Sequence, residues 1–242
     1  MTQQDKIYQN PAHRDQPFVF DDAVAEVFSD MVNRSVPGYA TLLGMFGVIA
    51  ERYVKPDTNV YDLGCSLGAS SIAMGRRIKA DGCRLIAVDN SAAMIRRCRG
   101  NLERANLRPR FELRREDVLD CHIDNASLVC LNLTLQFIVP ARRDRLIGNI
   151  RKGLLPDGAL ILAEKTASTE PARQELATDL HLGFKRANGY SDMEISRKRN
   201  ALENVLIPET AEAHEARLAR CGFSTIYPWF SCLDFRAWLA LP

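Results

Sequence analysis

The stretch Val60-Tyr61-Asp62-Leu63-Gly64-Cys65-Ser66-Leu67-Gly68 joins a short apolar run to a turn that contains two glycines. The apolar residues at 59–63 predict a buried strand, and residues 67–80 have the spacing of an amphipathic helix. Glycine lets the backbone turn tightly and approach a ligand closely, and the N–H groups at the start of the next helix then face that ligand. The stretch therefore predicts a strand–turn–helix unit of an α/β fold with a ligand bound at the turn.

The alternation of strand and helix continues well beyond this stretch. Five apolar runs predict strands at residues 59–63, 84–88, 110–113, 128–133 and 159–163. Three amphipathic stretches between them predict helices at residues 67–80, 91–105 and 141–155. This spacing is typical of a parallel sheet with right-handed crossovers, and ligands bind such sheets at the carboxyl ends of the strands.

Helical segments flank the alternating core. Apolar residues at helical spacing predict one helix that starts near Asp21 or Asp22 and a second from about Tyr39 to Tyr53. Residues 170–221 predict two or three further helices, which are rich in charge. Residues 224–230 and 232–239 predict a final pair of antiparallel strands.

These elements define a simple domain organisation. We expect residues 1–20 to form a flexible tail and residues 21–242 to form a single domain, since a chain of 242 residues suits one large domain. Within that domain, residues of about 165–221 form a helical insertion before the last two strands. We interpret this insertion as a lid or a dimer contact.

The composition is that of an ordinary globular protein. Of the residues, 46% are hydrophobic and 26% are charged, which excludes a disordered chain, a collagen-like repeat and a coiled-coil rod. The formal net charge of +2 lacks the basic excess of most nucleic-acid-binding proteins, so we expect no direct nucleic-acid partner. No apolar run approaches the roughly 18 residues of a membrane-spanning helix, and residues 1–15 contain no apolar signal segment.

Neither the cysteines nor the histidines have metal-binding spacing. The 7 cysteines form no C-x-x-C pair, and the 4 histidines are scattered along the chain. We therefore expect no metal site and no disulfide framework, and a reducing cytoplasm fits this use of cysteine.

The glycine turn differs from the dinucleotide-binding fingerprint. That fingerprint has glycine at the position of Ser66, so the turn gives poor support to a pyrophosphate ligand. Asp62, directly before the strand ends, suits a cationic group such as an ammonium, either directly or through water. The alternative is a purely structural strand-to-helix turn.

Polar residues follow the other predicted strands. Asp89 ends the second strand, and an acid at this position suits both ribose hydroxyls of a nucleoside. The alternative is that Asp89 forms a turn or caps a helix. Asp117, followed by Val118, suits an adenine amino group with the valine packed on the ring, or else lies in a solvated loop. Asn132 ends an apolar strand at the ligand crevice, or is a core amide paired with backbone.

Taken together, these features resemble the class I S-adenosyl-L-methionine (SAM)-dependent methyltransferases over residues 55–165 and the C-terminal strand pair. The resemblance implies a Rossmann-like α/β fold with a mostly parallel seven-stranded sheet, N-terminal helices, and a helical insertion before the last two strands.

Longer blocks resemble the carboxy-S-adenosyl-L-methionine synthase family over residues 18–240. The blocks are Arg34-Ser35-Val36-Pro37-Gly38-Tyr39, residues 61–68, Leu131-Asn132-Leu133-Thr134-Leu135-Gln136-Phe137, residues 184–191 and residues 198–205. The resemblance implies conversion of SAM and prephenate to carboxy-SAM and phenylpyruvate, with the product used by a partner enzyme that carboxymethylates the wobble uridine of tRNA. It implies these SAM-site residues: Tyr39, Gly64, Cys65, Ser66, Asp89, Asn90, Asp117, Val118, Asn132 and Arg199.

Arg199 lies in the basic run Arg197-Lys198-Arg199, which by sequence alone predicts a solvated helix face. The family resemblance instead assigns Arg199 to the new carboxylate, supplied from the neighbouring subunit of a homodimer. A guanidinium suits that carboxylate because its fork pairs with both oxygens. Val118 stands where the family usually has isoleucine, which preserves the apolar contact.

The sequence identifies no catalytic residue. In the reaction implied by the resemblance, the sulfonium methyl loses a proton and the resulting ylide attacks carbon dioxide, while prephenate supplies both the carbon dioxide and the base. The protein then contributes positioning and exclusion of water.

Two other functions remain open from the residues alone. One is an ordinary SAM-dependent methyltransferase that acts on tRNA or a small molecule. The other is a non-catalytic protein that uses the same fold to bind a partner. A nicotinamide-dependent dehydrogenase is disfavoured by Ser66.

Overall fold

The computed structural model describes residues 4–9 and 17–242. The strands are β1 (Asn59–Leu63), β2 (Arg84–Asp89), β3 (Arg110–Arg115), β4 (Ala126–Asn132), β5 (Leu154–Ala167), β6 (Glu209–Thr210), β7 (Thr225–Cys232) and β8 (Phe235–Leu241). The α-helices are α1 (Asp22–Ser35), α2 (Tyr39–Tyr53), α3 (Ala69–Gly75), α4 (Ala92–Ala105), α5 (Pro140–Gly153), α6 (Pro171–Ala187), α7 (Asp192–Leu202) and α8 (Ala211–Arg220). Two single-turn 3-10 helices, η1 (Ile7–Gln9) and η3 (Leu135–Phe137), complete the described elements.

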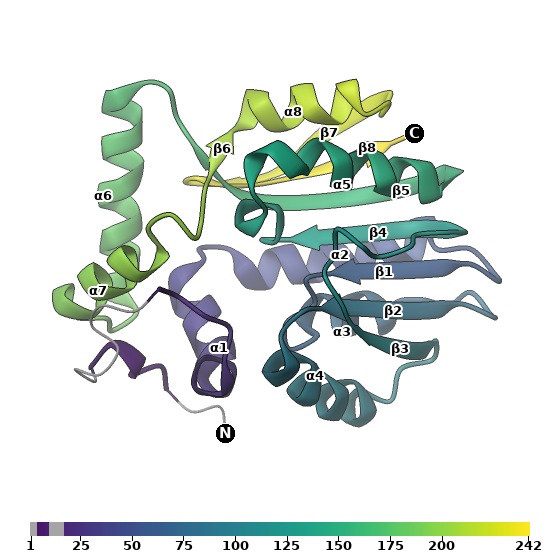
Figure 1. The fold of residues 1–242 in the computed structure, drawn as a ribbon, viewed down its shortest axis with the longest axis horizontal. Helices are drawn as coiled ribbons and strands as arrows, with labels where there is room; N and C mark the ends of the chain where they lie inside the picture. Colours follow the sequence, from purple (N-terminus) through teal and green to yellow (C-terminus); the bar gives the residue numbers. More distant parts are fainter. Residues whose placement is uncertain (1–3, 10–16) are drawn as a thin grey trace.

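A single twisted sheet forms the centre of the fold (Figure 1). Its main strand order is β3-β2-β1-β4-β5-β8-β7, and the two-residue strand β6 pairs with the far end of β5. β3, β2, β1, β4 and β5 are parallel, whereas β8 runs antiparallel to both β5 and β7. The predicted Rossmann-like fold with a mostly parallel seven-stranded sheet is therefore confirmed, and β6 is an addition that the sequence did not indicate.

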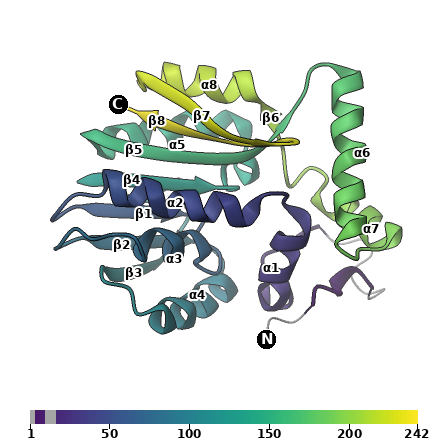
Figure 2. The same ribbon diagram turned by 180° about the vertical axis from the view of Figure 1, so that it is seen from behind.

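Helices cover both faces of the sheet because alternate strand residues point to opposite faces. In β1, Val60 packs in the cluster that includes Phe46 of α2 and Met74 of α3. Its neighbour Tyr61 packs in the cluster on the other face, which includes Leu146 of α5 and Leu218 of α8. Figures 1 and 2 show these two layers from opposite sides.

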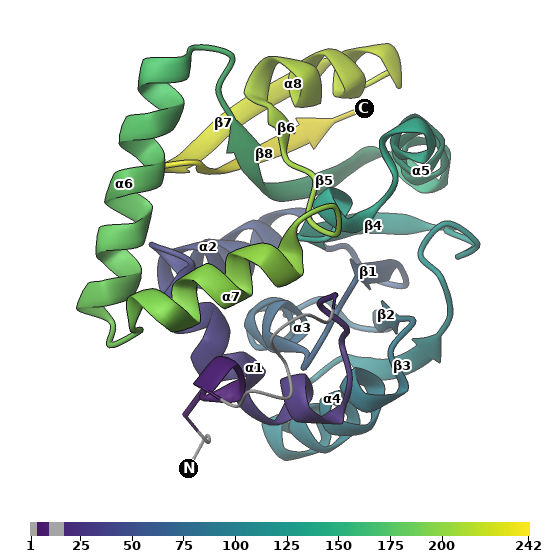
Figure 3. The ribbon, with the colours of Figure 1, turned by 60° about the vertical axis from the view of Figure 1, so that its left-hand side comes forward.

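The helices of the insertion lie beyond the ends of the strands. β5 leads directly into α6, so these are the carboxyl ends of the parallel strands. Figure 3 shows α6 and α7 there, with α1 beside them. The insertion and the N-terminal helices therefore enclose the carboxyl ends of the strands, where such sheets bind ligands.

The prediction of a flexible tail over residues 1–20 is wrong for the described part of that range. Asp5 and Tyr8 are 1% and 5% exposed, and the Asp5 carboxylate accepts a 2.5 Å hydrogen bond from the Tyr190 hydroxyl. Phe18 is buried as well, and its N–H donates to the carbonyl of Ala201 in α7. The physical reason is that this polar segment also contains aromatic side chains, which pack against α1 and α7. Residues 1–3 and 10–16 lie outside the described residues.

A buried carboxylate joins β5 to the loop after β4. Glu164 is 0% exposed, and its two oxygens accept the backbone N–H groups of Thr134, Leu135 and Gln136 at 3.1, 2.7 and 3.0 Å. Burial raises the pKa of Glu164 to about 8, although the three N–H groups oppose that shift. The carboxyl group thereby fixes the position of the segment that follows β4.

This arrangement predicts a graded loss of stability. Glu164→Met removes every acceptor and leaves three N–H groups, two of them buried, without a partner, which we expect to cost about 3 kcal/mol or more in the free energy of unfolding. Glu164→Gln keeps one carbonyl oxygen as an acceptor and should cost less. Urea unfolding followed by circular dichroism measures both, with the exposed Glu112→Gln as a control. Equal stability of Glu164→Met and the wild type would show that these hydrogen bonds contribute nothing.

No helix among residues 4–9 and 17–242 has both the length and the apolar character that crossing a membrane requires.

Candidate functional site

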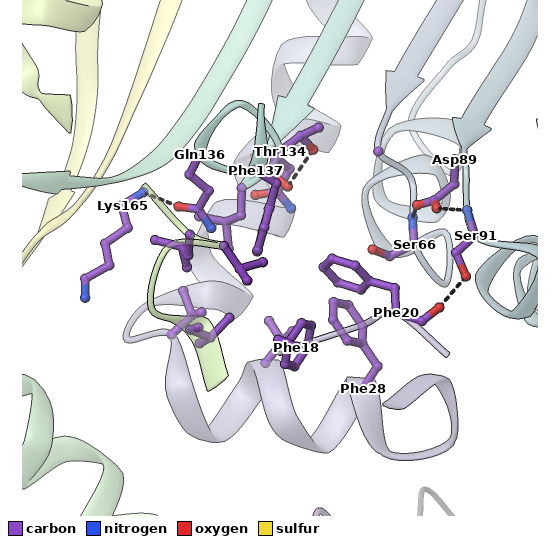
Figure 4. Close-up of a pocket in the computed structure, with 18 of the residues that line it drawn as sticks. Phe18, Phe20, Phe28, Ser66, Asp89, Ser91, Thr134, Gln136, Phe137 and Lys165 are labelled. Atoms are coloured by element: carbon purple, nitrogen blue, oxygen red, sulfur yellow. Dashed lines mark hydrogen bonds between the residues drawn. The ribbon is translucent and has the colours of Figure 1, made fainter. Parts of the chain in front are cut away.

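A cavity of about 670 Å³ lies at the carboxyl ends of the parallel strands. The ends of β1, β2, β4 and β5 and the loop after β3 supply its floor, while residues of α1, α6 and α7 supply its walls. Figure 4 shows part of this lining. The volume is within the ordinary range of small-molecule sites, which is roughly 300–1,000 Å³.

The predicted glycine turn takes a conformation that side chains disfavour. Gly64, Ser66 and Gly68 have φ angles of 81°, 49° and 83°, all in the left-handed region. A Cβ atom on Gly64 would lie 2.3 Å from Oγ1 of Thr134, so the close approach of the two loops requires glycine there. The turn therefore exposes backbone to the cavity, as the sequence predicted.

Asp89 fixes this turn against the next strand. One carboxylate oxygen accepts the N–H of Ser66 and the other accepts the N–H of Ser91, each at 2.9 Å (Figure 4). The side chain is 9% exposed and lines the cavity, and burial raises its pKa. Each oxygen retains a lone pair, so the carboxylate is able to accept further hydrogen bonds from a ligand diol.

Asp62 lies beneath the turn, outside the cavity lining. It is 1% exposed, its Oδ2 accepts a 2.6 Å hydrogen bond from Ser71, and its Oδ1 has no partner among the described residues. Burial raises its pKa to about 6. The sequence suggested that Asp62 meets a cationic group directly or through water, but its side chain does not line the cavity. Asp62 lies near Tyr39, whose pKa is raised by burial and, to a lesser extent, by this carboxylate.

Asn132 lines the same end of the cavity. Its Nδ2 donates to the Ser70 hydroxyl at 3.0 Å, whereas its buried Oδ1 has no partner in the described chain. A buried amide oxygen without a partner is costly, and an ammonium group or another donor would satisfy it. The sequence left open a core amide paired with backbone; in the described chain the Asn132 side chain pairs instead with the Ser70 hydroxyl, and the residue lines the cavity.

The loop after β3 completes this end. The Asp117 carboxylate accepts the Leu119 N–H at 2.9 Å, and Val118 is buried beside it. The structure thus brings nine of the ten predicted SAM-site residues into one cavity lining: Tyr39, Gly64, Cys65, Ser66, Asp89, Asn90, Asp117, Val118 and Asn132.

Arg199 is the residue that the structure places elsewhere. It is exposed on α7 and lies outside the cavity of its own chain, although it is near enough to Lys165 to lower the pKa of that lysine. Two residues of α7 line the cavity, Leu202 and Lys198, and Lys198 is 6% exposed. A helix advances 100° per residue, so neighbours in the basic run face different directions.

Aromatic residues of the cavity wall were not predicted from the sequence. Phe20 makes edge contacts with Phe18, Phe28 and Phe137, with ring centroids 5.0, 6.0 and 5.3 Å apart (Figure 4). The hydroxyl of Ser91 donates to the carbonyl of Phe20 at 2.5 Å and so ties the wall to the end of β2. The available signal was the pair of phenylalanines in an otherwise polar N-terminal segment.

Three lysines and a histidine line the other end of the cavity and were also missed. We call Lys165 of β5, Lys185 of α6 and Lys198 of α7 the lysine cluster. Burial lowers the pKa of Lys185 to about 8 and that of Lys198 to about 7, and each is lowered further by a neighbouring lysine. The charge run near residue 198 was visible in the sequence, but the convergence of three elements was not.

His181 shares this end but is not a cation. Its Nε2 lies 2.7 Å from the Ser35 carbonyl oxygen, which only accepts hydrogen bonds, so Nε2 carries the proton. Burial lowers the His181 pKa to about 3, and the adjacent lysines lower it as well.

Comparison with known proteins matches one family model and several named relatives. A family model described as a methyltransferase domain matches residues 60–158. The carboxy-S-adenosyl-L-methionine synthase of Stutzerimonas stutzeri is 49% identical, with 98% of each chain covered, and that of Pseudomonas putida is 49% identical, with 99% of each chain covered. The chain belongs to the carboxy-S-adenosyl-L-methionine synthase family. The corresponding synthase of Yersinia pestis is 46% identical over 99% of this chain and 90% of its own.

Solved structures with low sequence identity share the fold of this synthase family. An O-methyltransferase family protein from Burkholderia thailandensis is 16% identical with a TM-score of 0.64, covering 94% of this chain and 64% of its own. The apo form of the SAM-dependent methyltransferase SibL is 13% identical with a TM-score of 0.62, covering 90% of this chain and 57% of its own. These matches support the methyltransferase-like fold and carry no further conclusion about the site.

The His181 geometry predicts the behaviour of its imidazole. Because burial lowers the pKa to about 3, we expect a neutral ring protonated at Nε2 from pH 5.5 to pH 8. Long-range proton–nitrogen NMR spectra of the labelled protein measure this directly, and His181→Gln assigns the signal. The exposed His122 shows in the same spectra how an accessible imidazole behaves. A His181 signal that titrates within this interval would contradict the assigned environment.

Proposed function

We propose that this protein converts SAM and prephenate into carboxy-SAM and phenylpyruvate. The observation that carries the proposal is a single cavity with two chemically different ends. Carboxylates and a glycine turn line one end, and the lysine cluster lines the other. A cationic sulfonium nucleoside suits the first end and an anionic carboxyl donor suits the second. Nearly half identity to carboxy-SAM synthases over almost the full chain supports the same assignment.

The residues at the carboxylate end fit SAM as a substrate. Asp89 would accept hydrogen bonds from the ribose hydroxyls, and Asp117 with Val118 would hold the adenine by its amino group and its ring face. The unpaired Oδ1 of Asn132 fits the amino group of the methionine moiety, while the Gly64-Cys65-Ser66 backbone approaches the ligand closely. Asn90 and Tyr39 complete this half of the site.

The proposed reaction balances without a protein-derived base. Prephenate loses carbon dioxide and hydroxide to become phenylpyruvate, the hydroxide takes a proton from the sulfonium methyl, and the ylide attacks the carbon dioxide. The new C–C bond forms on the former methyl carbon, and water is the remaining product. The role of the protein is to hold both substrates in the relative orientation that the reaction needs and to exclude bulk water. The phenylalanines of the wall, which pack edge to face, are suited to excluding water.

We also propose that the functional unit is a homodimer. Arg199 is exposed and lies outside its own cavity, which supports a role in the site of the other chain. Arg199 of the partner subunit would pair with the carboxylate of carboxy-SAM through its two-pronged guanidinium.

The product would be the donor for a tRNA carboxymethyltransferase that modifies the wobble uridine. The net charge of +2 supports a protein that binds no tRNA itself. All 7 cysteines are free, which supports a reducing, cytoplasmic location.

Mass spectrometry tests the proposed reaction. The purified protein, incubated with SAM and prephenate, is expected to yield a nucleoside heavier than SAM by one carbon dioxide, together with phenylpyruvate. Omission of prephenate should abolish the product. Transfer of an unmodified methyl group to tRNA or to a small molecule without prephenate would instead indicate an ordinary methyltransferase.

The Asp89 contacts predict a loss of nucleoside affinity. Asp89→Ala removes the ribose acceptor and also releases the Ser66 and Ser91 N–H groups, so we expect SAM to bind about tenfold to a hundredfold more weakly. Isothermal titration calorimetry measures the dissociation constant. The exposed Asp120→Ala is a matched control and should bind SAM as the wild type does. An unchanged affinity for Asp89→Ala would remove this residue from the nucleoside site.

If each subunit supplies Arg199 to the site of the other, two inactive variants should restore activity to each other in a mixed dimer. Arg199→Ala and Asp89→Ala should each form little carboxy-SAM, because each lacks one component of every site. Mixed dimers of the two variants contain one intact site, so mixing after subunit exchange should restore about a quarter of the wild-type rate. Light scattering checks that the variants remain dimeric. Full activity of Arg199→Ala, or no recovery on mixing of dimeric variants, would contradict the shared site.

A further inference from the structure

The lysine cluster converges on one region of the cavity from three separate elements. Lys165 is near the end of β5, Lys185 lies one helical turn beyond His181 in α6, and Lys198 projects from α7. The insertion supplies two of the three, so the cluster forms only when α6 and α7 fold over the sheet edge (Figure 3).

These charges are poorly compensated within the protein. In the described part of the chain, the Nζ atoms of Lys165 and Lys185 have no hydrogen bond and no ion pair, and Asp234 only partly offsets the lowering of the Lys165 pKa. Lys198 donates to the Ser35 hydroxyl at 3.1 Å and lies 3.7 Å from the Asp5 carboxylate. Like charges that converge in a partly desolvated cavity repel one another, and an anion bound among them relieves that repulsion.

Lys165 of the cluster lies away from Ser66 and Asp89. Figure 4 places Lys165 on the side of the cavity opposite Ser66 and Asp89, with the phenylalanines between them. A SAM molecule held by Asp89 and Asn132 therefore leaves the lysine end accessible to a second, anionic molecule.

On the basis of the proposed function, we propose that Lys165, Lys185 and Lys198 bind the carboxylate of prephenate that is retained in phenylpyruvate. Prephenate carries two carboxylates, and one of them leaves as carbon dioxide. A lysine paired with the leaving carboxylate would stabilise the charged substrate more than the transition state and would slow decarboxylation. Lysines paired with the retained carboxylate avoid this cost, and they anchor the molecule so that the leaving carboxylate points toward the sulfonium.

Single and double substitutions of the two lysines without hydrogen-bonded Nζ groups test this assignment. Lys165→Gln and Lys185→Gln each remove one charge, and we expect each to raise the KM for prephenate about tenfold or more, with a larger rise in the double variant. The dissociation constant of SAM should change less than about twofold, because these residues lie at the other end of the cavity. Lys152→Gln, which removes an exposed lysine from α5, is the charge-matched control and should match the wild type. Lys198 is left unchanged because its contacts with Ser35 and Asp5 also hold α7 in place.

A second measurement does not depend on turnover. Phenylpyruvate is titrated by calorimetry into protein saturated with S-adenosylhomocysteine; it should bind the wild type and Lys152→Gln and lose most of its affinity for the double variant. Wild-type carboxy-SAM formation with unchanged prephenate KM in the double variant would overturn the lysine assignment and leave the proposed function intact. If the wild type formed no carboxy-SAM, the proposed function would fail. Lysine-dependent phenylpyruvate binding would then still support the carboxylate site, and its absence would overturn it.

Discussion

Buried carboxylates at the strand ends, which accept backbone N–H groups from neighbouring loops, are the interaction on which the site depends. Asp89 holds both the glycine turn and the start of α4, and Glu164 holds three consecutive N–H groups of the loop after β4. A loop that approaches a ligand cannot complete its hydrogen bonds within a sheet or helix, so side chains must satisfy them. Here the two carboxyl groups hold loops that line the cavity, and Asp89 also lines the cavity itself.

The sheet and the insertion contribute opposite charges to one cavity. The strand ends bring acids, as in many nucleoside-binding α/β folds, whereas α6 and α7 bring lysines against the end of β5. A substrate pair of opposite charge fits such a division, because each molecule is attracted to a different end and the reacting groups meet between them. The insertion therefore lines the cavity as well as covering it.

Much of the fold could be predicted because its signals are local. The alternation of apolar runs with amphipathic stretches located the five parallel strands to within a few residues, although β5 extends well beyond its predicted run of 159–163. The N-terminal segment was misjudged because the burial of Tyr8 and Phe18 depends on partners near residues 190–201, which are distant in the sequence. Local composition carries no information about such contacts.

The sequence by itself determined that the polar residues after β1, β2 and β4 and in the loop after β3 gather in one cavity, since the carboxyl ends of parallel strands lie at the same end of the sheet. Only the tertiary structure decided that Lys198 faces the cavity while Arg199 faces outward, and that Lys165 and Lys185 join it there. The reason is geometric: the direction of a side chain on a helix is known only once the packing of that helix is known, and charges from separate elements interact only after the chain has folded.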